Sequence, residues 1–497
     1  MTEVATFRNP VLGGDRPDPA VIKVGDEYWM TYSSFESAPG LLLYRSRDLV
    51  NWTYSGAALS EPIGSTFAVD IAEHEGRFFI YIPFIPAPWS ALTAPAIFVI
   101  HADSMEGPWS QPVDLGIRGA IDPGHVVGED GKRYLFVNGI RRIALTDDGL
   151  ATIGELEQVY DGWTYPDEWV TEAYALEGPK LFWRDGWLYL ISAVGGTGGP
   201  PTGHMVIAAR SRSVHGPWQN SPHNPVTRTK DAAERWWSRG HATILPRPAA
   251  SGDVHWWMLS HGYENGYRTL GRQILLEPVT WTDDGWPIGA PDIGGALPAP
   301  VGAQPQRPAI GLYDDFTSLR LGERWAFHAP SSGESTRIRI ERGMVLEGKG
   351  ASPDDTSPLA MVVGEHAYEV EVDIELLDVG VEAGLLLYFN DRLFCGMGID
   401  GQRMRSYMGG HASHWREPAP SVRRLQLRLR NDRHIVTGWY REPGDEWTRH
   451  AIRYETSGYH ANTMGDLQSL RPALYSTGDG AARFRDFRYR PLAAAEA

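Results

Sequence analysis

The chain has 497 residues, of which 62 are acidic and 46 are basic, so its formal net charge is −16. This balance argues against a protein that binds nucleic acid through its phosphates, because that mode of binding needs clustered cations. Hydrophobic residues make up 42% of the chain, which is enough for two cores. No stretch approaches the ~18 uninterrupted apolar residues of a membrane helix, so we expect no membrane partner.

The N-terminal residues and the cysteine content both bear on the cellular compartment of the protein. The N-terminal residues lack a basic start followed by an apolar run, which predicts no signal peptide and a cytoplasmic location. Cys395 is the single cysteine, so no disulfide can form within the chain.

A turn followed by an aromatic-rich strand recurs at intervals of 50 to 70 residues. The five copies are Gly25-DEYWMTYSS, Glu75-GRFFIYIPF, Asp130-GKRYLFVNG, Arg184-DGWLYLISA and Gly252-DVHWWMLSH. The period is that of a four-stranded propeller blade. Turns that end in Trp52, Trp109 and Trp218 recur in phase with these strands. We therefore predict an all-β fold with a five-bladed β-propeller over residues 1–295.

One polar residue lies just upstream of each repeat, in an otherwise apolar stretch. These residues are Asp18, Asp70, Asp122, Glu177 and His241. The first strand of a propeller blade lines the central channel, so we expect the five side chains to meet near one axis. Four acids and a histidine indicate acid–base chemistry, most plausibly on a sugar. Asp18 and Asp122 each precede proline, so a plain turn is the alternative reading of both.

The texture of the sequence changes after the last repeat. Residues 296–310 are rich in proline and glycine and are predicted to form a linker or an extended strap. Alternating strands without a blade period follow over residues 311–497, which is typical of a two-sheet β-sandwich.

Several short motifs together resemble glycoside hydrolase family 43. They are Gly14-DRPDPAVI, Ser46-RDLVNW, Ile121-DPG, Glu177-GPK, Arg239-GHATI and Gly271-RQ, and the resemblance covers roughly residues 8 to 290. Members of this family are five-bladed propellers that cleave arabinose- and xylose-containing glycans. The tail resembles the concanavalin-like sandwich appended to the β-xylosidase-type members.

The resemblance also implies roles for the acids. Asp18 matches the general base, Glu177 the general acid, and Asp122 the third acid that holds the general acid and tunes its pKa. An inverting glycosidase needs such a pair, because one carboxylate activates water while a protonated carboxyl on the other face protonates the leaving oxygen. Arg272 matches an arginine that lies near the sugar and the acids.

Other residues are expected around the sugar. Phe35, on the rim, and Phe67 and Asp70, where the family usually has Trp-Ala-Pro-Asp, are candidate substrate contacts. Trp163 and Trp169 could stack on the leaving-group sugar. His241 could hold a water or a structural calcium ion at the axis, and a core histidine is the alternative. No Cys/His cluster has zinc spacing, which argues against a catalytic transition metal, and we expect no cofactor to be required.

We predict an exo-acting, inverting β-xylosidase that releases terminal xylose from short xylan-derived oligosaccharides. An α-L-arabinofuranosidase, or an exo-glycosidase for another furanoside or pentoside, is the nearest alternative. A sugar-binding propeller without catalysis is another, and so is a glycoside phosphorylase that uses Arg16, Arg239 and Arg272 for phosphate. The sequence is compatible with a monomer and with a homo-oligomer.

Overall fold

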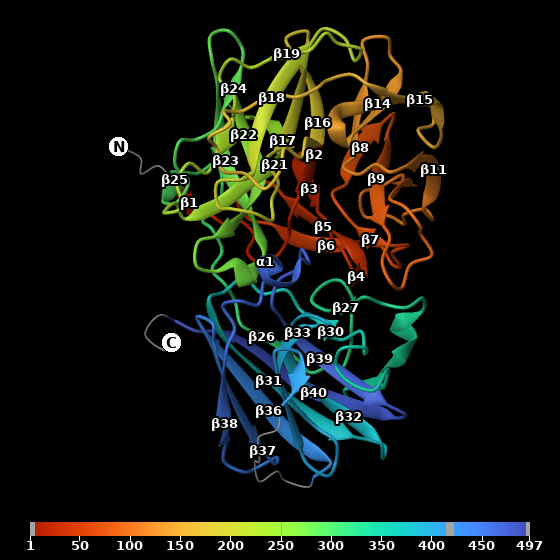
Figure 1. The fold of residues 1–497 in the computed structure, drawn as a ribbon, viewed down its shortest axis with the longest axis vertical. Coiled ribbons are helices and arrows are strands. Elements are labelled where there is room, and N and C mark those ends of the chain that lie inside the picture. The colour runs from red at the N-terminus through yellow and green to blue at the C-terminus, as the bar shows by residue number, and fades with distance from the viewer. Residues whose placement is uncertain (1–4, 250, 414–421, 494–497) are drawn as a thin grey trace. The chain divides into compact units, whose positions relative to one another are not determined.

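The computed structural model describes residues 5–249, 251–413 and 422–493 (Figure 1). The chain divides into two compact units. The first contains residues 1–35, 40–265 and 272–307, and the second contains residues 36–39, 266–271 and 308–497. No helix of the described residues is long and apolar enough to cross a membrane.

The first unit is built from five antiparallel sheets that follow one another along the chain, one for each repeat. This arrangement confirms the predicted five-bladed propeller. The first blade contains β2 (Ala20–Val24), β3 (Glu27–Thr31), β5 (Gly40–Ser46) and β6 (Thr53–Leu59). The second contains β7 (Ser65–Thr66), β8 (Asp70–His74), β9 (Arg77–Ile85), β10 (Ala96–Ala102) and β11 (Val113–Arg118).

The remaining three blades continue this order. The third contains β12 (Gly124–Val127), β13 (Arg133–Val137), the 3-10 turn η1 (Asn138–Ile140), β14 (Arg141–Leu145) and β15 (Thr152–Gln158). The fourth contains β16 (Glu177–Arg184), β17 (Trp187–Val194), β18 (Met205–Ser211), β19 (Gln219–Asn220) and β20 (Thr227–Arg228). The fifth contains β21 (Trp236–Pro248), β22 (Val254–Glu264), β23 (Arg272–Trp281) and β24 (Pro287–Ile288).

The repeated aromatic-rich segments form one equivalent strand in every blade, namely β3, β9, β13, β17 and β22. Each pairs with the strand that precedes it, as Ile22 of β2 does with Trp29 of β3. The Trp-ended turns lie between the third and fourth strands of three blades. The sequence period therefore reports the blade period.

The predicted linker begins with an ordered pairing. Ala296–Pro298 forms β25, which pairs with β1 (Thr6–Arg8) near the start of the chain. Gln306 then donates a hydrogen bond to the carbonyl of Arg8 at 2.8 Å. The first part of residues 296–310 is thus tied to the propeller unit as a strap.

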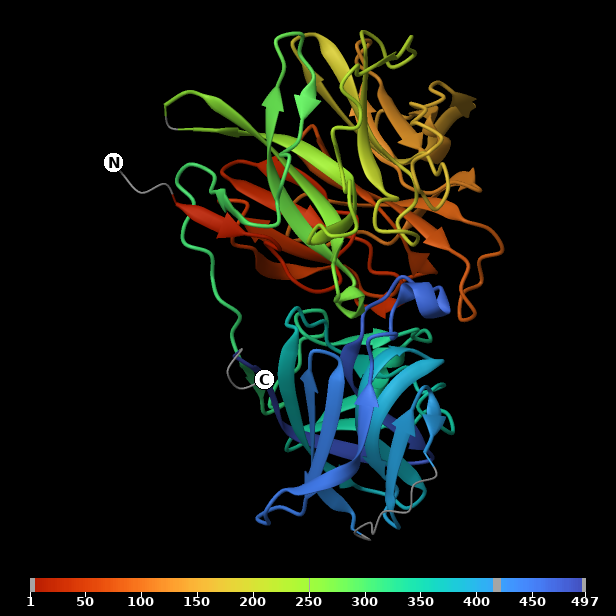
Figure 2. The same ribbon diagram turned by 60° about the vertical axis from the view of Figure 1, so that its left-hand side comes forward.

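The second unit has two antiparallel sheets of eight strands each (Figure 2). One sheet contains β26 (Leu312–Asp314), β28 (Ile338–Ile340), β29 (Met344–Glu347), β31 (Ala367–Leu376), β36 (Arg424–Asp432), β37 (Ile435–Arg441), β38 (Thr448–Glu455) and β40 (Ala481–Pro491). The other contains β4 (Ser37–Ala38), β27 (Ala326–His328), β30 (Leu359–Ala360), β32 (Val381–Asn390), β33 (Leu393–Ile399), β34 (Met404–Met408), β35 (His411–Ala412) and β39 (Arg471–Gly478).

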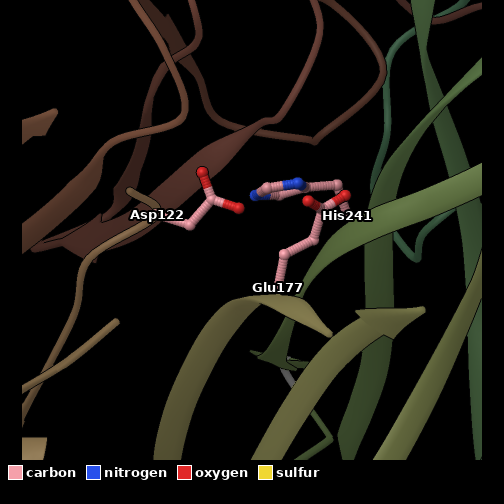
Figure 3. Close-up of side chains that lie close together, drawn as sticks. All are labelled: Asp122, Glu177 and His241. Atoms are coloured by element: carbon pink, nitrogen blue, oxygen red, sulfur yellow. The ribbon is translucent and has the colours of Figure 1, made fainter. Parts of the chain in front are cut away.

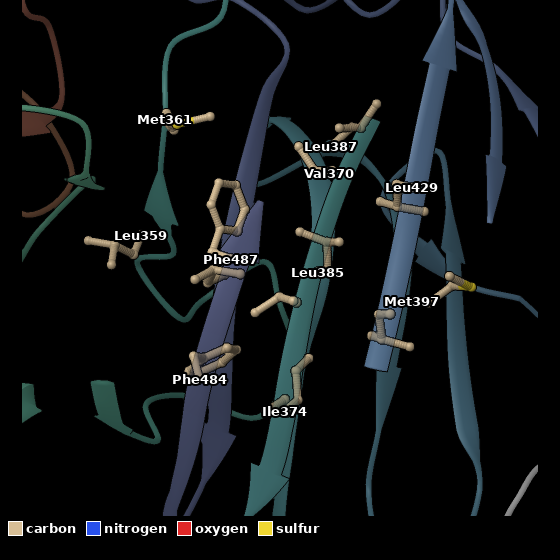
Figure 4. Close-up of a cluster of buried hydrophobic side chains, with 14 of the residues drawn as sticks. Leu359, Met361, Val370, Ile374, Leu385, Leu387, Met397, Leu429, Phe484 and Phe487 are labelled. Atoms are coloured by element: carbon tan, nitrogen blue, oxygen red, sulfur yellow. The ribbon is translucent and has the colours of Figure 1, made fainter. Parts of the chain in front are cut away.

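Both sheets of this unit contribute to one hydrophobic core (Figure 4). Val370, Ile374 and Leu429 come from the first sheet and pack with Leu385 and Met397 of the second. Every second residue of β31 and β32 faces this core, as the alternating sequence requires. Two sheets over one core is the layer arrangement of a β-sandwich. Its expected likeness to the concanavalin type stays a prediction.

The short helical elements of the second unit are η2 (Arg268–Leu270), η3 (Glu334–Arg337) and α1 (Ala461–Met464). Cys395 is a buried core residue of β33, and burial raises the pKa of its thiol. A thiol of this kind is an inert packing group.

Candidate active site

Four of the five polar residues upstream of the repeats meet in the propeller unit. Asp18 and Asp122 lie two residues before the first strands of their blades, Glu177 is the first residue of β16, and His241 lies within β21. Ligand atoms of Asp122, Glu177 and His241 all lie within 4.8 Å of one another. Figure 3 shows the Asp122 carboxyl and the His241 ring pointing toward each other, with Glu177 beside them.

Three of these residues have a left-handed backbone. The φ angles are 61° at Asp18, 55° at Asp122 and 52° at His241. Such conformations are uncommon for residues other than glycine, and they concentrate at functional sites. The strain therefore supports the view that these positions aim side chains for chemistry.

Gly178 explains why Glu177 can lie so close to the histidine. Its φ is 62°, and a Cβ atom at this position would lie 2.9 Å from ring atoms of His241. The Gly178 N–H donates to Oδ2 of Asp122 at 3.1 Å. Asp122 thus holds the backbone next to Glu177, and a larger residue in place of Gly178 would displace the imidazole.

The Asp18 carboxylate is buried and has four side-chain neighbours. Its Oδ1 lies 3.0 Å from Nδ1 of His261 and 3.2 Å from NH1 of Arg272. Nδ1 of His241 lies 3.4 Å from the same oxygen. Its Oδ2 accepts a hydrogen bond of 2.5 Å from the Ser33 hydroxyl. Oδ1 therefore has three nitrogen neighbours, whereas Oδ2 has one partner.

These neighbours determine the charge of Asp18. Burial alone would raise the pKa of this carboxyl, but Arg272, His241 and His261 outweigh it and hold the pKa well below its usual range. Asp18 is therefore ionised at neutral pH.

Glu177 and Asp122 behave in the opposite way. Burial, reinforced by the negative charge of Asp18, raises the pKa of Glu177 to about 7. Burial and then the nearby Glu177 carboxyl raise the pKa of Asp122 well above its usual range. The two carboxyls face each other and titrate as a pair, which keeps a proton near neutrality.

Two further histidines surround the acids, and the sequence analysis did not assign them. His261 ends the fifth aromatic repeat, and its ring centroid lies 5.2 Å from that of His204. Nε2 of His204 lies 3.6 Å from Oε1 of Glu177. Burial lowers the pKa of His261 to about 3 and that of His204 to about 4, so both rings are neutral. The signal for His261 was its place at the end of a repeat.

An aromatic pair lies beside Asp18. The rings of Phe35 and Phe67 meet edge to face, with centroids 5.1 Å apart. The Arg272 guanidinium lies 5.4 Å from the centre of the Phe35 ring. The structure therefore brings these three predicted substrate contacts together, next to the ionised carboxylate.

Asp70 does not join the acid cluster. It forms a buried ion pair of 2.7 Å with Lys180, and its Oδ2 accepts a 2.7 Å hydrogen bond from the His125 N–H. Asp70 is thus held in a buried ion pair, and its role as a substrate contact stays a prediction.

Trp163 and Trp169 pack against each other, with ring centroids 6.1 Å apart. Tyr165 stacks on Trp169 from one side, and the Arg228 guanidinium lies 3.4 Å from the Trp169 ring centre. Both indoles are half-buried in this cluster, and their predicted stacking on a leaving-group sugar stays a prediction.

Asp122, Glu177 and His241 are the described residues that could hold a metal ion. They offer two carboxylates and one imidazole, whereas calcium takes six to eight oxygen ligands. A divalent cation would also ionise the pair of carboxyls that otherwise keeps a proton. The donor set by itself therefore fits calcium poorly. Nε2 of His241 is buried and has no partner among the described residues, so it suits a water molecule.

Comparison with known proteins gives a consistent result. The family model described as "Glycosyl hydrolases family 43" matches residues 7–287. The chain is 31% identical over 375 residues to a xylan 1,3-beta-xylosidase of Vibrio sp, covering 64% of this chain and 66% of that protein. It is 33% identical over 349 residues to a non-reducing end alpha-L-arabinofuranosidase of Bacteroides ovatus, covering 65% of this chain and 61% of that protein. The chain thus spans less than two thirds of the length of these two relatives.

Among solved structures, the GH43 BlXynB protein of Bacillus licheniformis superposes with a TM-score of 0.86 at 24% identity, covering 98% of this chain and all of that chain. A likeness at this level of identity concerns the fold, and it extends over both units.

Proposed function

The chain belongs to glycosyl hydrolase family 43, whose model matches more than half of its length, and on that premise we propose that it is an exo-acting, inverting glycoside hydrolase. In this proposal it releases terminal xylose from short xylan-derived oligosaccharides. One observation carries the proposal: within one cluster, the pKa of Asp18 is held low while that of Glu177 is raised to about 7. Inversion at an anomeric carbon needs such an ionised and protonated pair.

Asp18 is the general base of this reaction. Its Oδ1 is occupied by Arg272 and two histidines, whereas Oδ2 accepts one hydrogen bond, from Ser33. The remaining lone pair of Oδ2 is therefore the one that takes a proton from the attacking water. The hydrogen bond from Ser33 orients this oxygen.

Glu177 is the general acid, and it donates its proton to the oxygen that bridges to the leaving group. A pKa near 7 suits this step, because about half of the groups are protonated at neutral pH and the proton is still given up readily. Asp122 acts through Glu177 as a positioning residue, since it accepts the Gly178 N–H. Their shared titration supports the predicted tuning of the acid.

The sugar to be released lies between Asp18 and Glu177 in this mechanism. Arg272 can donate to a sugar hydroxyl while it pairs with Asp18. The Phe35–Phe67 pair gives this position an apolar wall. The first strands of five blades surround the cluster, so a chain end reaches it more readily than the middle of a chain. This geometry supports the exo mode.

Xylose and arabinofuranose are the two candidate sugars. One relative is named a xylan beta-xylosidase and the other an alpha-L-arabinofuranosidase, at similar identity. We favour xylose because the resemblance of the C-terminal unit is to β-xylosidase-type proteins. An α-L-arabinofuranosidase is the second candidate, supported by Phe67, which stands where the β-xylosidase pattern has Trp.

Phosphorolysis and non-catalytic sugar binding are less well supported. Arg239 donates to the carbonyl of Arg228 at 2.6 Å and lies 3.9 Å from Glu277, so its guanidinium already has protein partners. Arg16 packs over the Tyr44 ring at 5.7 Å. The guanidinium groups of Arg16, Arg239 and Arg272 thus already have protein partners, which disfavours a shared phosphate site. All three acids of the proposed mechanism are present, which disfavours a purely binding role.

Hydrolysis of nitrophenyl β-xyloside, α-L-arabinofuranoside and β-galactofuranoside tests the reaction and the sugar. We expect the β-xyloside to be cut fastest, and NMR of the first product to show inverted anomeric configuration. From xylotetraose, xylose and xylotriose should appear first. Retention of configuration, or xylobiose as the main early product, would refute the mechanism or the exo mode respectively.

No cofactor is required in this proposal. A chelator should leave kcat/KM within about twofold, and loss of activity that calcium restores would instead assign a cation to the Asp122–Glu177–His241 group. The oligosaccharide substrate is the partner we propose. A cytoplasmic location remains a prediction from the sequence, and size measurement in solution would decide between a monomer and a homo-oligomer.

A further inference from the structure

A hollow of about 730 Å³ lies beside Glu177 in the propeller unit. Its lining includes Asn138, Gln158, Asp161 and Tyr174, together with Glu177 itself. Asn138 begins η1 and Gln158 ends β15, both in the third blade, and the other two residues belong to the segment that leads to β16. The hollow is thus formed between the third and fourth blades, at the general acid.

The side-chain amides of Asn138 and Gln158 are each fixed at the hollow through one of their two polar atoms. Oδ1 of Asn138 accepts the Ile121 N–H at 3.0 Å. Nε2 of Gln158 donates to the carbonyls of Gly139 at 2.6 Å and Tyr160 at 2.7 Å. Nδ2 of Asn138 and Oε1 of Gln158 have no protein partner within the described part of the chain. A fixed donor and a fixed acceptor are therefore available for a ligand.

Asp161 and Tyr174 complete the lining. Among the described residues the exposed Asp161 carboxylate accepts no hydrogen bond and forms no ion pair. The Tyr174 ring is 40% exposed, and its hydroxyl donates to the carbonyls of Asp161 at 3.1 Å and Trp163 at 3.3 Å. These bonds hold the ring in place, so the hollow offers both hydroxyl-binding groups and an aromatic face.

We propose that this hollow binds the leaving group, and that Asp161, Asn138 and Gln158 make the enzyme selective for a sugar as that leaving group. The inference rests on the proposed function, because it needs Glu177 as the acid. The bond to be broken lies at the Glu177 carboxyl, so the departing unit must lie on the acid's side of the site. Sugar hydroxyls match the paired donors and acceptors, whereas an aromatic leaving group leaves them unpaired.

The assignment differs from the sequence expectation for this region. Trp163 and Trp169 pack with Tyr165 and Arg228, so the aromatic face of the hollow comes from Tyr174 instead. The selectivity then depends on polar contacts between the hollow and the leaving group. Of the three polar side chains, Asp161 can be replaced with the least effect on the neighbouring backbone.

The test compares two substrates that share the released xylose, namely xylobiose and nitrophenyl β-xyloside. Asp161→Ala should lower kcat/KM for xylobiose by roughly tenfold and leave the nitrophenyl substrate within about twofold, since a hydrogen bond to a charged group is lost with only one of them. Asp161→Asn, which keeps an acceptor, should lie between. Asp167→Ala, an exposed carboxylate on the same segment, should change neither value. Equal effects on both substrates, or none on xylobiose, would overturn the proposal.

Binding provides a readout that does not depend on turnover. Calorimetric titration can be done in the Asp18→Asn background. There, Asp161→Ala should weaken the binding of xylobiose by roughly fivefold and the binding of free xylose by less than twofold. Absence of hydrolysis by the unaltered protein would refute the proposed function, whereas unchanged xylobiose binding would refute the leaving-group site. Failure of one can therefore be told from failure of the other.

Discussion

Nδ1 of His261 lies 3.0 Å from Oδ1 of Asp18, on the side of the carboxylate away from the Ser33 hydrogen bond. Nε2 of the same ring lies 3.2 Å from the Thr197 hydroxyl. His261 is fully buried and neutral, so it carries one ring proton. Nδ1 also accepts the Asp18 N–H at 3.1 Å, so His261 holds the backbone of Asp18 and lies against the carboxylate that we propose as the general base.

His261→Leu removes this contact and tests its role. We expect kcat/KM to fall by roughly tenfold to a hundredfold, because the buried Asp18 N–H loses its acceptor and the carboxylate loses a neighbour that positions it. Because His261 helps to hold the pKa of Asp18 low, the acid limb of the pH profile should also move to higher pH. His255→Leu, at an exposed position of the same strand, is the control. An unshifted acid limb in His261→Leu would contradict the positioning role.

Glu177 should govern the alkaline limb of the pH profile. Its pKa is raised to about 7 by burial and by the charge of Asp18, and only the protonated form can act as acid. Activity should therefore be lost as pH rises through about 7. In Glu177→Gln this limb should vanish, with losses of roughly 10²–10⁴ on xylobiose and far less on an activated nitrophenyl glycoside. Equal losses on the two substrates would remove Glu177 from this role.

Glu172 is expected to tune that limb from outside the cluster. Its carboxylate accepts the Gly198 N–H at 2.7 Å, and its charge contributes to the raised pKa of Glu177. Glu172→Gln keeps an acceptor for Gly198 but removes the charge, so the alkaline limb should move to lower pH while Tm stays unchanged. Glu172→Ala should shift the limb equally and also lower Tm. An identical limb in all three proteins would show that the charge of Glu172 does not reach the acid.

The sequence predicted the blades well because their signals are local. A turn followed by alternating apolar residues reports a strand wherever it occurs, and its recurrence reports the blade. Equivalent positions in successive blades also explain why Asp18, Asp122 and Glu177 could be assigned together. Each lies at or just before the first strand of its blade.

Side-chain contacts between blades could not be predicted from the sequence. Asp70 occupies the equivalent position in the second blade, but it forms an ion pair with Lys180 of the fourth blade, 110 residues away. His204 reaches Glu177 only because Gly240 leaves room, since a Cβ atom there would lie 2.3 Å from the His204 ring. Neither relationship has a local signature. The divergent pKa values follow from such contacts, so they too required the structure.

We expect that breaking the Asp70–Lys180 ion pair changes the stability of the protein and leaves substrate binding unchanged. Lys180 donates to Oδ1 of Asp70 and to the Val69 carbonyl, each at 2.7 Å, and both charged groups are buried. Asp70→Asn leaves the ammonium without its counter-charge, which typically costs about 3–5 kcal/mol for a buried pair. For a unit of this size we expect Tm to fall by roughly 5–10 °C, with KM for nitrophenyl β-xyloside within about twofold. Adding Lys180→Met should restore most of the lost stability, because a neutral pair needs no compensation. A raised KM with unchanged Tm would instead return Asp70 to the sugar site.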